Sequence, residues 1–164
     1  MVLKSYEKNG PTYIRLTNAR EAKTYKEKPN LEIGKASILR EGKDILIIAS
    51  GLQAGFSLQV ANELKKQGHD IKVVSMHTIK PINKKNILEL SENIKNIFLF
   101  EEHSNLGGAG SAVAEILLGA GWKGKFKVFG VPDEFSKDIG TADYLRSKYL
   151  LDEDGILKTL LKEI

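Results

Sequence analysis

Cysteine is absent from this 164-residue sequence, which excludes disulfide frameworks and zinc sites built on cysteine thiolates. No apolar run approaches the roughly 18 residues that a membrane-spanning helix requires. The first ten residues, MVLKSYEKNG, lack the hydrophobic centre of a signal peptide. We therefore expect a cytoplasmic protein that has no membrane partner.

An excess of charge of one sign is also missing. The sequence has 25 basic and 21 acidic residues, and the two kinds are interspersed; even the locally basic piece from Lys23 to Lys28 contains Glu27. A nucleic-acid-binding surface requires basic residues gathered on one face, so we expect no nucleic-acid partner. The 41% hydrophobic and 28% charged residues are typical of a globular domain long enough to bury a core.

From Leu31 onward, short apolar runs alternate with amphipathic stretches separated by turn signals. The runs predict strands at 31–39, 44–50, 71–76, 97–100 and 126–130, and the stretches predict helices at 54–67, 83–93, 109–120, 141–148 and from 152 to the C-terminus. Strands that alternate with helices form parallel sheets covered on both faces. The sequence therefore predicts a three-layer α/β/α domain with a mixed, mainly parallel sheet of about five strands. The short turn at 40–43 predicts one antiparallel edge strand, paired with the strand that follows it.

The chain before Leu31 has a different character. Residues 11–17, PTYIRLT, alternate as a strand does, whereas the polar, lysine-rich residues 18–29 show no clear period. About a dozen structureless residues are long for a loop inside one compact domain. We therefore place a domain boundary here, with a tail at 1–20 and a domain at 21–164.

The most informative stretch is 96–117, NIFLFEEHSNLGGAGSAVAEIL. It combines a short apolar strand, a polar loop, a glycine-rich turn and an amphipathic helix. Loops at the carboxyl ends of parallel strands are where ligands and partners gather. The glycines either let the helix start close against the sheet, or form a phosphate or dinucleotide cradle at the helix N-terminus. The cradle pattern is incomplete, because a third glycine and a Walker-type lysine are missing and residues 101–106 separate the strand from Gly107.

Two of the three histidines follow predicted strands, so we expect His77 and His103 at the carboxyl edge of the sheet. His69 lies in a Gly-His-Asp turn at the opposite edge. The HExxH spacing of a zinc site is absent, and we assign no metal ligand. His103 could act with Glu102 in acid–base chemistry, or both edge histidines could serve packing or an interface.

Glu101 and Glu102 could be paired catalytic carboxylates, but adjacent residues of an extended chain point to opposite sides and cannot readily share a substrate. Ser111 is not in the GxSxG pattern of a nucleophile elbow. We therefore assign no catalytic and no cofactor-binding residue. The residues that we place at an interface or active-site rim are His77, Glu102, His103, Gly107 and Gly108.

Five stretches together resemble the C-terminal domain of the transketolase family. They are GPTYIRL (10–16), EIGKASILREGKDILIIASG (32–51), SMHTIKPI (75–82), EEHSNLGGAGSAVAE (101–115) and GVPDEF with the following IGT (130–141). The resemblance covers essentially the whole chain in the family's order. It is closest to the C-terminal half of split, two-subunit transketolases. Deoxyxylulose-5-phosphate synthase and the β subunits of 2-oxoacid dehydrogenase E1 components are relatives, and the domain could come from either.

The resemblance implies an enzyme that transfers two-carbon ketol units with thiamine diphosphate and a magnesium ion, which bind between two other domains. It implies that this domain contributes to dimer contacts and to the surroundings of the site, and that residues 1–20 are the end of the preceding pyrimidine-binding domain. The expected partners are the cofactor-binding domains or subunit of the same enzyme and a second copy in a homodimer. The rival interpretation is a regulatory α/β module that binds a nucleotide or phosphate at 107–111.

Two departures from the family pattern matter. The glutamate that activates the cofactor and the GDG…N metal motif are not among these residues, so we expect the isolated chain to bind no thiamine diphosphate and to be inactive. Relatives often read YxRLGR, with a final arginine that holds a substrate phosphate. Asn18 stands at that position here, with Arg20 two residues further on, which leaves the substrate class open.

Overall fold

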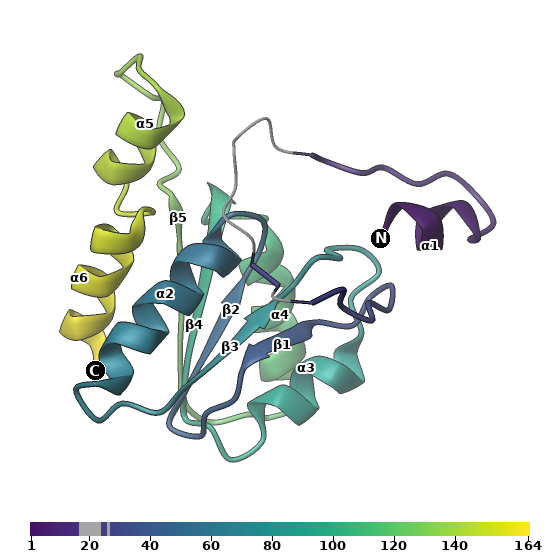
Figure 1. Ribbon diagram of the computed structural model, residues 1–164, viewed down its shortest axis with the longest axis horizontal. Helices are drawn as coiled ribbons and strands as arrows, with labels where there is room; N and C mark the ends of the chain where they lie inside the picture. The colour runs from purple at the N-terminus through teal and green to yellow at the C-terminus, as the bar shows by residue number, and fades with distance from the viewer. Residues whose placement is uncertain (17–23, 26) are drawn as a thin grey trace.

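The computed structural model describes residues 1–16, 24–25 and 27–164 (Figure 1). Its centre is a five-stranded sheet in the order β1-β3-β2-β4-β5. The strands are β1 (Ser37–Arg40), β2 (Ile45–Ala49), β3 (Ile71–Ser75), β4 (Asn96–Ser104) and β5 (Lys125–Val131). β1 runs antiparallel to β3, and all other neighbours are parallel. The predicted mixed sheet with one antiparallel edge strand is thereby confirmed.

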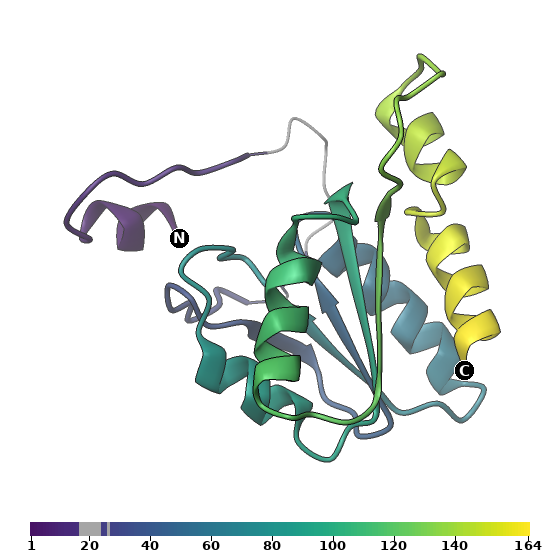
Figure 2. The ribbon, with the colours of Figure 1, turned by 180° about the vertical axis from the view of Figure 1, so that it is seen from behind.

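Helices cover both faces of this sheet (Figures 1 and 2). α2 (Gln53–Lys65) and α6 (Glu153–Glu163) pack on one face, and α3 (Lys84–Ser91) and α4 (Ala109–Gly119) pack on the other. All five residues of β2 are buried, as a central strand covered on both sides requires. The three-layer α/β/α architecture is confirmed.

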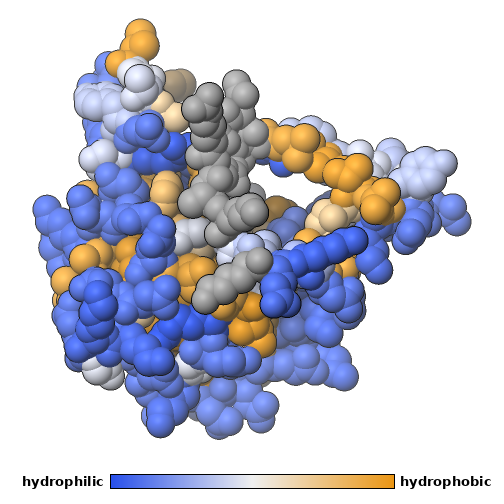
Figure 3. All heavy atoms as spheres, viewed as in Figure 1, coloured by the Kyte–Doolittle hydropathy of each residue, from blue (hydrophilic) through white to orange (hydrophobic). Residues whose placement is uncertain are grey.

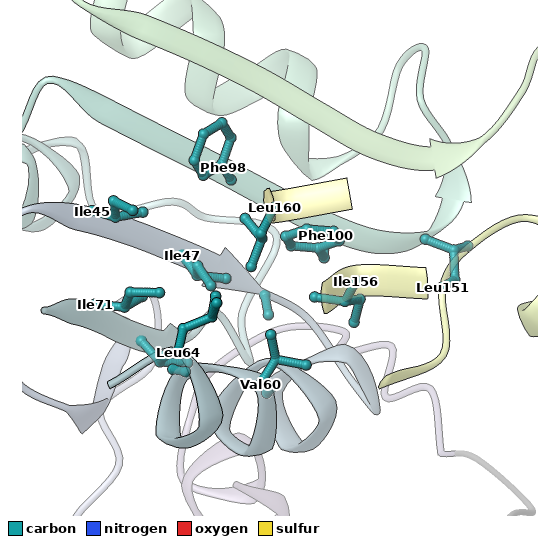
Figure 4. Close-up of a cluster of buried hydrophobic side chains, with 14 residues drawn as sticks. Ile45, Ile47, Val60, Leu64, Ile71, Phe98, Phe100, Leu151, Ile156 and Leu160 are labelled. Carbon is teal, nitrogen blue, oxygen red and sulfur yellow. The ribbon is translucent and has the colours of Figure 1, made fainter. Parts of the chain in front are cut away.

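Each face of the sheet has its own hydrophobic core, because successive strand residues point to opposite sides. Phe98 and Phe100 of β4 belong to the same buried cluster as Leu64 of α2 and Leu160 of α6 on one side (Figure 4). Ile97 and Leu99 meet residues of α3 and α4 on the other. Fully burying one such side chain contributes about 1.5–3 kcal/mol. The alternation along β4 also decides where the polar residues at its end point.

Three helices are capped at their N-termini by polar side chains of the types that favour this position. Asn83 accepts a hydrogen bond from the Asn86 amide at 3.0 Å at the start of α3. Thr141 accepts a hydrogen bond from the backbone amide three residues further on at the start of α5 (Ala142–Lys148). Asp152 does so at the start of α6. A cap of this kind stabilises a helix by about 1 kcal/mol because it satisfies an otherwise unpaired amide.

The partner of β1 differs from the prediction. The short 40–43 turn suggested pairing with β2, but β3 lies between them and pairs with β1, with Ser37 opposite Ser75. Loop length constrains only consecutive strands, and a later strand can insert between them. β1 also begins at Ser37, so the predicted strand start at Leu31 was wrong.

Two other boundaries were also wrong. β4 continues to Ser104, four residues beyond the predicted end, so Glu101, Glu102 and His103 belong to the strand and not to a loop. The predicted strand at 11–17 has no strand structure over 11–16, which is extended chain without a neighbouring strand; Thr17 lies outside the described residues.

The N-terminal arm, residues 1–16, consists of α1 (Val2–Tyr6) and the extended segment, and it projects away from the sheet (Figures 1 and 2). It exposes the large side chains Val2, Leu3, Tyr6, Tyr13, Ile14 and Leu16. The aliphatic members of this set give the arm much of its orange colour in Figure 3. The proposed boundary near residue 20, with Asn18 and Arg20, lies outside the described residues. Within the described part of the chain, no helix is both long and apolar enough to cross a bilayer.

Candidate functional site at the carboxyl edge of the sheet

The residues that the sequence placed at the rim lie at the carboxyl edge of the sheet. His77 follows the end of β3. Glu102 and His103 lie near the end of β4, and Gly107 and Gly108 precede α4. Figure 2 shows the arrowhead of β4 beside the start of α4. The side-chain contacts of these residues decide what the rim can do.

Glu101 is buried, with 2% of its surface exposed. Its Oε2 accepts a hydrogen bond from the Ala109 amide at 2.8 Å, and its Oε1 accepts one from the Gly110 amide at 3.1 Å. These are the first two amides of α4, where the helix dipole favours a negative charge. The carboxylate therefore fills the anion-binding position of this helix from within the chain.

The glycines of the turn make room for this carboxylate. A β-carbon at Gly108 would overlap the Glu101 carboxylate, and one at Gly110 would lie 2.5 Å from both methyl carbons of Val128 and 3.1 Å from Glu101 Oε1. Gly107 has a φ of +75° and donates its amide to Ser111 Oγ at 2.9 Å. Close approach of helix and strand, the first of the two interpretations, explains the glycine pattern.

The rival interpretation, a phosphate or nucleotide at 107–111, does not fit this arrangement. A phosphate at a helix N-terminus is held by the free amides of the first turn. Here the Ala109 and Gly110 amides already bind Glu101, and the Gly107 amide binds Ser111. An incoming anion would also meet the negative charge of Glu101. We therefore do not propose an anion site at this turn.

Glu102, the next residue of β4, points to the opposite face of the sheet and pairs with Arg146 of α5. Glu102 Oε1 lies 2.5 Å from Arg146 Nε, with 21% and 13% of the two side chains exposed. Arg146 Nη1 also donates to Asp143 at 2.9 Å. Burial disfavours the charge of Arg146, but the hydrogen bonds and charges of Glu102 and Asp143 outweigh it and raise the guanidinium pKa. The ion pair fastens α5 to the rim.

His77 and His103 lie at the same edge, but β2 separates their strands. Two strand spacings amount to roughly 10 Å, so the two rings do not form a pair. His77 Nδ1 lies 2.9 Å from Thr78 Oγ1, and its Nε2 is buried without a hydrogen-bond partner among the described residues. Burial, and to a lesser degree the nearby positive amino terminus, lowers the pKa of His77. Its ring is therefore neutral at pH 7.

His103 is the exposed member of the rim. Its Nδ1 lies 3.0 Å from the carbonyl oxygen of Ser104. A carbonyl only accepts, so Nδ1 carries the proton of this hydrogen bond. Glu102 is engaged with Arg146, so the structure does not supply the acid–base pair of His103 with Glu102 that the sequence left open.

The described residues show which groups could meet a metal ion or an anionic ligand. They contain no group of three or more histidine, aspartate or glutamate side chains placed to hold a metal. The hollow beside α5 and α6, about 310 Å³, is lined by Asp143, Asp152, Glu153 and Asp154 with Phe56 and Arg146, and four carboxylates repel an anionic ligand. A larger hollow of about 560 Å³, next to Trp122, lies at the opposite edge of the sheet.

Sequence reasoning missed two parts of this arrangement. Arg146 lies 44 residues from Glu102, and nothing in the pattern around α5 connects the two. The role of Glu101 had a partial signal, since a buried-strand carboxylate directly before a glycine-rich helix start suits the helix dipole.

Comparison with known proteins relates this chain to one family, the transketolases and their relatives. Residues 34–156 match the family model described as the C-terminal domain of transketolase. A 6-deoxy-6-sulfo-D-fructose transketolase subunit of Clostridium sp. (strain MSTE9) is 35% identical over 92% of this chain and 46% of its own length. The 1-deoxy-D-xylulose-5-phosphate synthase of Halothermothrix orenii is 35% identical over 80% of this chain and 21% of its own.

Among solved structures, a split-gene transketolase in the form of an inactive β4 tetramer superposes with a TM-score of 0.88. It is 33% identical and covers 98% of this chain, while this chain covers 52% of that one. The chain thus spans about half the length of the first curated relatives that it matches.

Proposed function

Because this chain belongs to the transketolase C-terminal domain family, we propose that it shapes the active site and the assembly of an enzyme that transfers two-carbon ketol units. The enzyme would depend on thiamine diphosphate and magnesium held by its other domains. One observation carries the proposal: both carboxylates at the end of β4 are used to hold the chain's own helices, Glu101 on α4 and Glu102 on α5. In this proposal the rim is a fixed surface and not a reacting centre.

The described residues of this chain do not fit thiamine diphosphate. The amides of Ala109 and Gly110 are taken by Glu101, the hollow near α5 is acidic, and the described residues hold no metal cluster. We therefore assign no step of the reaction to these residues. The cofactor and its metal would belong to the part of the enzyme that this chain completes.

The proposed partner surface is the rim formed by His77, Glu102, His103, Gly107 and Gly108. Exposed apolar side chains flank it, with Ile79 46% and Leu106 60% exposed. Apolar residues next to a fixed polar edge are typical of a surface that is covered by another protein domain. We propose that this rim lies against the cofactor-binding domains and that the complete enzyme is a homodimer.

We also propose that residues 1–20 are the end of the preceding domain and that 21–164 form the C-terminal domain. The arm supports this division, because its apolar side chains lie away from both hydrophobic cores. Apolar groups of this kind would be buried against the domain to which they belong. In the complete enzyme the arm would be ordered by that domain.

A transketolase is favoured over a deoxyxylulose-5-phosphate synthase. At the same 35% identity, the likeness to the transketolase subunit of Clostridium sp. covers 92% of this chain, whereas that to the synthase of Halothermothrix orenii covers 80%. The donor and acceptor sugars are determined by the other domains in this proposal.

Isothermal titration calorimetry of the isolated chain tests the proposed division of labour. Thiamine diphosphate with magnesium is titrated into the chain, and we expect no binding heat at cofactor concentrations up to the millimolar range. Thiamine monophosphate with magnesium serves as the control for unspecific anion binding. Saturable micromolar binding of the diphosphate would contradict the proposal, because these residues would then contain the cofactor site.

A further inference from the structure

The dipeptide Asn9-Gly10 lies in the N-terminal arm, in the turn that follows α1. We propose that Asn9 is a modification site, at which the side-chain amide is lost without an enzyme to give aspartate and isoaspartate, and that the reaction is slowed when the preceding domain covers the arm. The protection by that domain rests on the proposed function, whereas the modification itself does not.

The backbone around Asn9 is open. α1 ends at Tyr6, and Asn9 and Gly10 lie in irregular structure in which both residues are exposed. Gly10 has a φ of +95°, a conformation that glycine reaches without steric cost. A β-carbon at this position would meet nothing within 4 Å. Packing therefore leaves this turn open to water.

The reaction needs only these two residues and water. The backbone nitrogen of Gly10 attacks Cγ of the Asn9 side chain, and a succinimide ring forms as the bond from Cγ to the amide nitrogen breaks. Ammonia leaves with the proton that the Gly10 nitrogen gives up. Water then opens the ring at either carbonyl, which yields aspartate or, where the backbone runs through Cγ, isoaspartate. Near neutral pH each product carries one negative charge that asparagine lacks.

Two features leave the attacking nitrogen available. Gly10 has no side chain, so nothing of its own shields this atom. Within the described part of the chain, the Gly10 amide donates no hydrogen bond; the last amide of the turn that does so belongs to Lys8, which donates to the Ser5 carbonyl at 3.3 Å. An amide held by a hydrogen bond would have to break it before attacking. The turn therefore does not restrain the nucleophile.

The chain contains its own comparisons for this reaction. Asn9 is the only one of the nine asparagines that glycine follows. Other asparagines lie within helices and strands, where regular hydrogen bonds fix the backbone: Asn62 in α2, Asn86 in α3 and Asn96 in β4. The pair Asp154-Gly155 could form the same ring with loss of water, but it lies in α6, and the Gly155 amide donates to Asp152 Oδ1 at 2.9 Å. We therefore expect Asn9 to react well before these residues.

The products alter the surface with which the arm would dock. The arm exposes Leu3, Tyr6 and Ile14, which the proposed function buries against the preceding domain. A carboxylate in place of the neutral amide is unfavourable in such an interface unless a partner compensates its charge. Isoaspartate also adds a methylene group to the path of the backbone. Conversely, a turn that is ordered by another domain cannot rotate freely into the geometry of ring closure, so the covered arm should react more slowly.

Peptide mapping of the isolated chain tests the modification. The folded chain is incubated at mildly alkaline pH, digested with trypsin and analysed by liquid chromatography and mass spectrometry, and an unincubated sample corrects for changes during digestion. Cleavage after Lys8 and Arg15 yields the peptide 9–15, in which Asn9 is the only asparagine. Its mass should rise by about 1 Da, the difference between an amide and a carboxylic acid, in two products that separate on the column. The peptides that contain Asn62 and Asn86 should keep their masses over the same period.

Gly10→Ala is the matched variant. It should slow the mass gain at Asn9 by about tenfold or more, because a side chain then covers the attacking nitrogen. The melting temperature should match that of the wild type, because the arm lies outside both hydrophobic cores. Loss of the Asn9 amide that is no faster than loss at Asn62, or an equal rate in Gly10→Ala, would overturn the modification site.

The same mapping, with the cofactor-binding part of the enzyme added to the chain, tests the protection. The rate at Asn9 should fall in the combined sample, while the peptides with Asn62 and Asn86 remain unchanged. If Asn9 reacts in the isolated chain and equally fast in the combined sample, the protection and the covered arm of the proposed function both fail, and the modification site stands. If Asn9 does not react in the isolated chain, the modification site fails whatever the activity of the complete enzyme.

Discussion

Glu102 of β4 and Arg146 of α5, 44 residues apart in the chain, meet with Oε1 2.5 Å from Nε. Both side chains are largely shielded from water. This contact connects the end of a central strand to a short helix in which no residue is buried. Together with Leu151, which follows the helix and is buried in the core, it keeps α5 in its place beside the rim.

Removal of this ion pair should destabilise the domain. We expect Glu102→Gln and Arg146→Gln each to lower the free energy of unfolding by about 1–2 kcal/mol, with a coupling of about 1 kcal/mol in the double-mutant cycle, because the pair is partly buried. Urea unfolding followed by circular dichroism measures both quantities. Asp143→Asn breaks the other contact of Arg146. The Asp143 side chain is 94% exposed, so this substitution should lower the free energy of unfolding by less than about 0.5 kcal/mol. Equal losses for Glu102→Gln and Asp143→Asn would contradict this ranking.

The glycines of α4 provide a second, sterically defined prediction. Gly110→Ala places a methyl group 2.5 Å from the Val128 methyl carbons, and we expect it to lower the free energy of unfolding by about 1–3 kcal/mol, the usual cost of overpacking. Gly119→Ala, at the other end of the same helix, meets no atom within 4 Å.

Gly119→Ala should be neutral or stabilising by up to about 1 kcal/mol, because alanine has the higher helix propensity. Thermal unfolding of the two variants beside wild type makes the comparison. A Gly110→Ala variant as stable as Gly119→Ala would show that α4 does not lie this close to β4 and β5.

The stability of the domain should depend on pH through His77. Burial lowers the pKa of His77 in the folded chain, so the unfolded chain binds the proton more readily below the ordinary histidine pKa of about 6.5. The free energy of unfolding should therefore be at its full value above pH 6.5 and fall as the pH drops through the lowered pKa. Denaturant unfolding at several pH values between 7.5 and 4.5 measures the slope.

Other groups titrate in the same range, so the prediction concerns a difference between variants. His77→Gln should show a shallower loss of stability on acidification than wild type. His69→Gln, which removes the turn histidine, provides the matched control. Identical pH slopes for wild type and His77→Gln would rule out a folded-state preference for the neutral ring.

Local patterns in the sequence were sufficient to predict most of the fold. The apolar run at 44–50, the caps Asn83, Thr141 and Asp152, and the glycines after the strands are signals that act within a few residues. The partner of β1 required information that no local pattern contains, since the insertion of β3 beside it depends on the whole sheet. The end of β4 was missed because its last residues are polar, and two of them, Glu101 and Glu102, bind other chain segments in place of water.

The rim could be placed from sequence but its contacts could not. His77, Glu102 and His103 follow apolar runs, and this is enough to put them at the carboxyl edge. The glycines at 107–110 allowed both a phosphate cradle and a close helix, and only the position of the Glu101 carboxylate decides between them. The pairing of Glu102 with Arg146 depends on the path of the chain between β5 and α5.

The central claim, that this domain completes an active site that it does not contain, is tested most directly by reconstitution. Ketol transfer is assayed with thiamine diphosphate and magnesium for this chain alone, for the remaining cofactor-binding part of the enzyme alone, and for the two together. The account predicts activity only for the combined sample. Ketol transfer by residues 1–164 alone, or full activity of the cofactor-binding part without them, would contradict it.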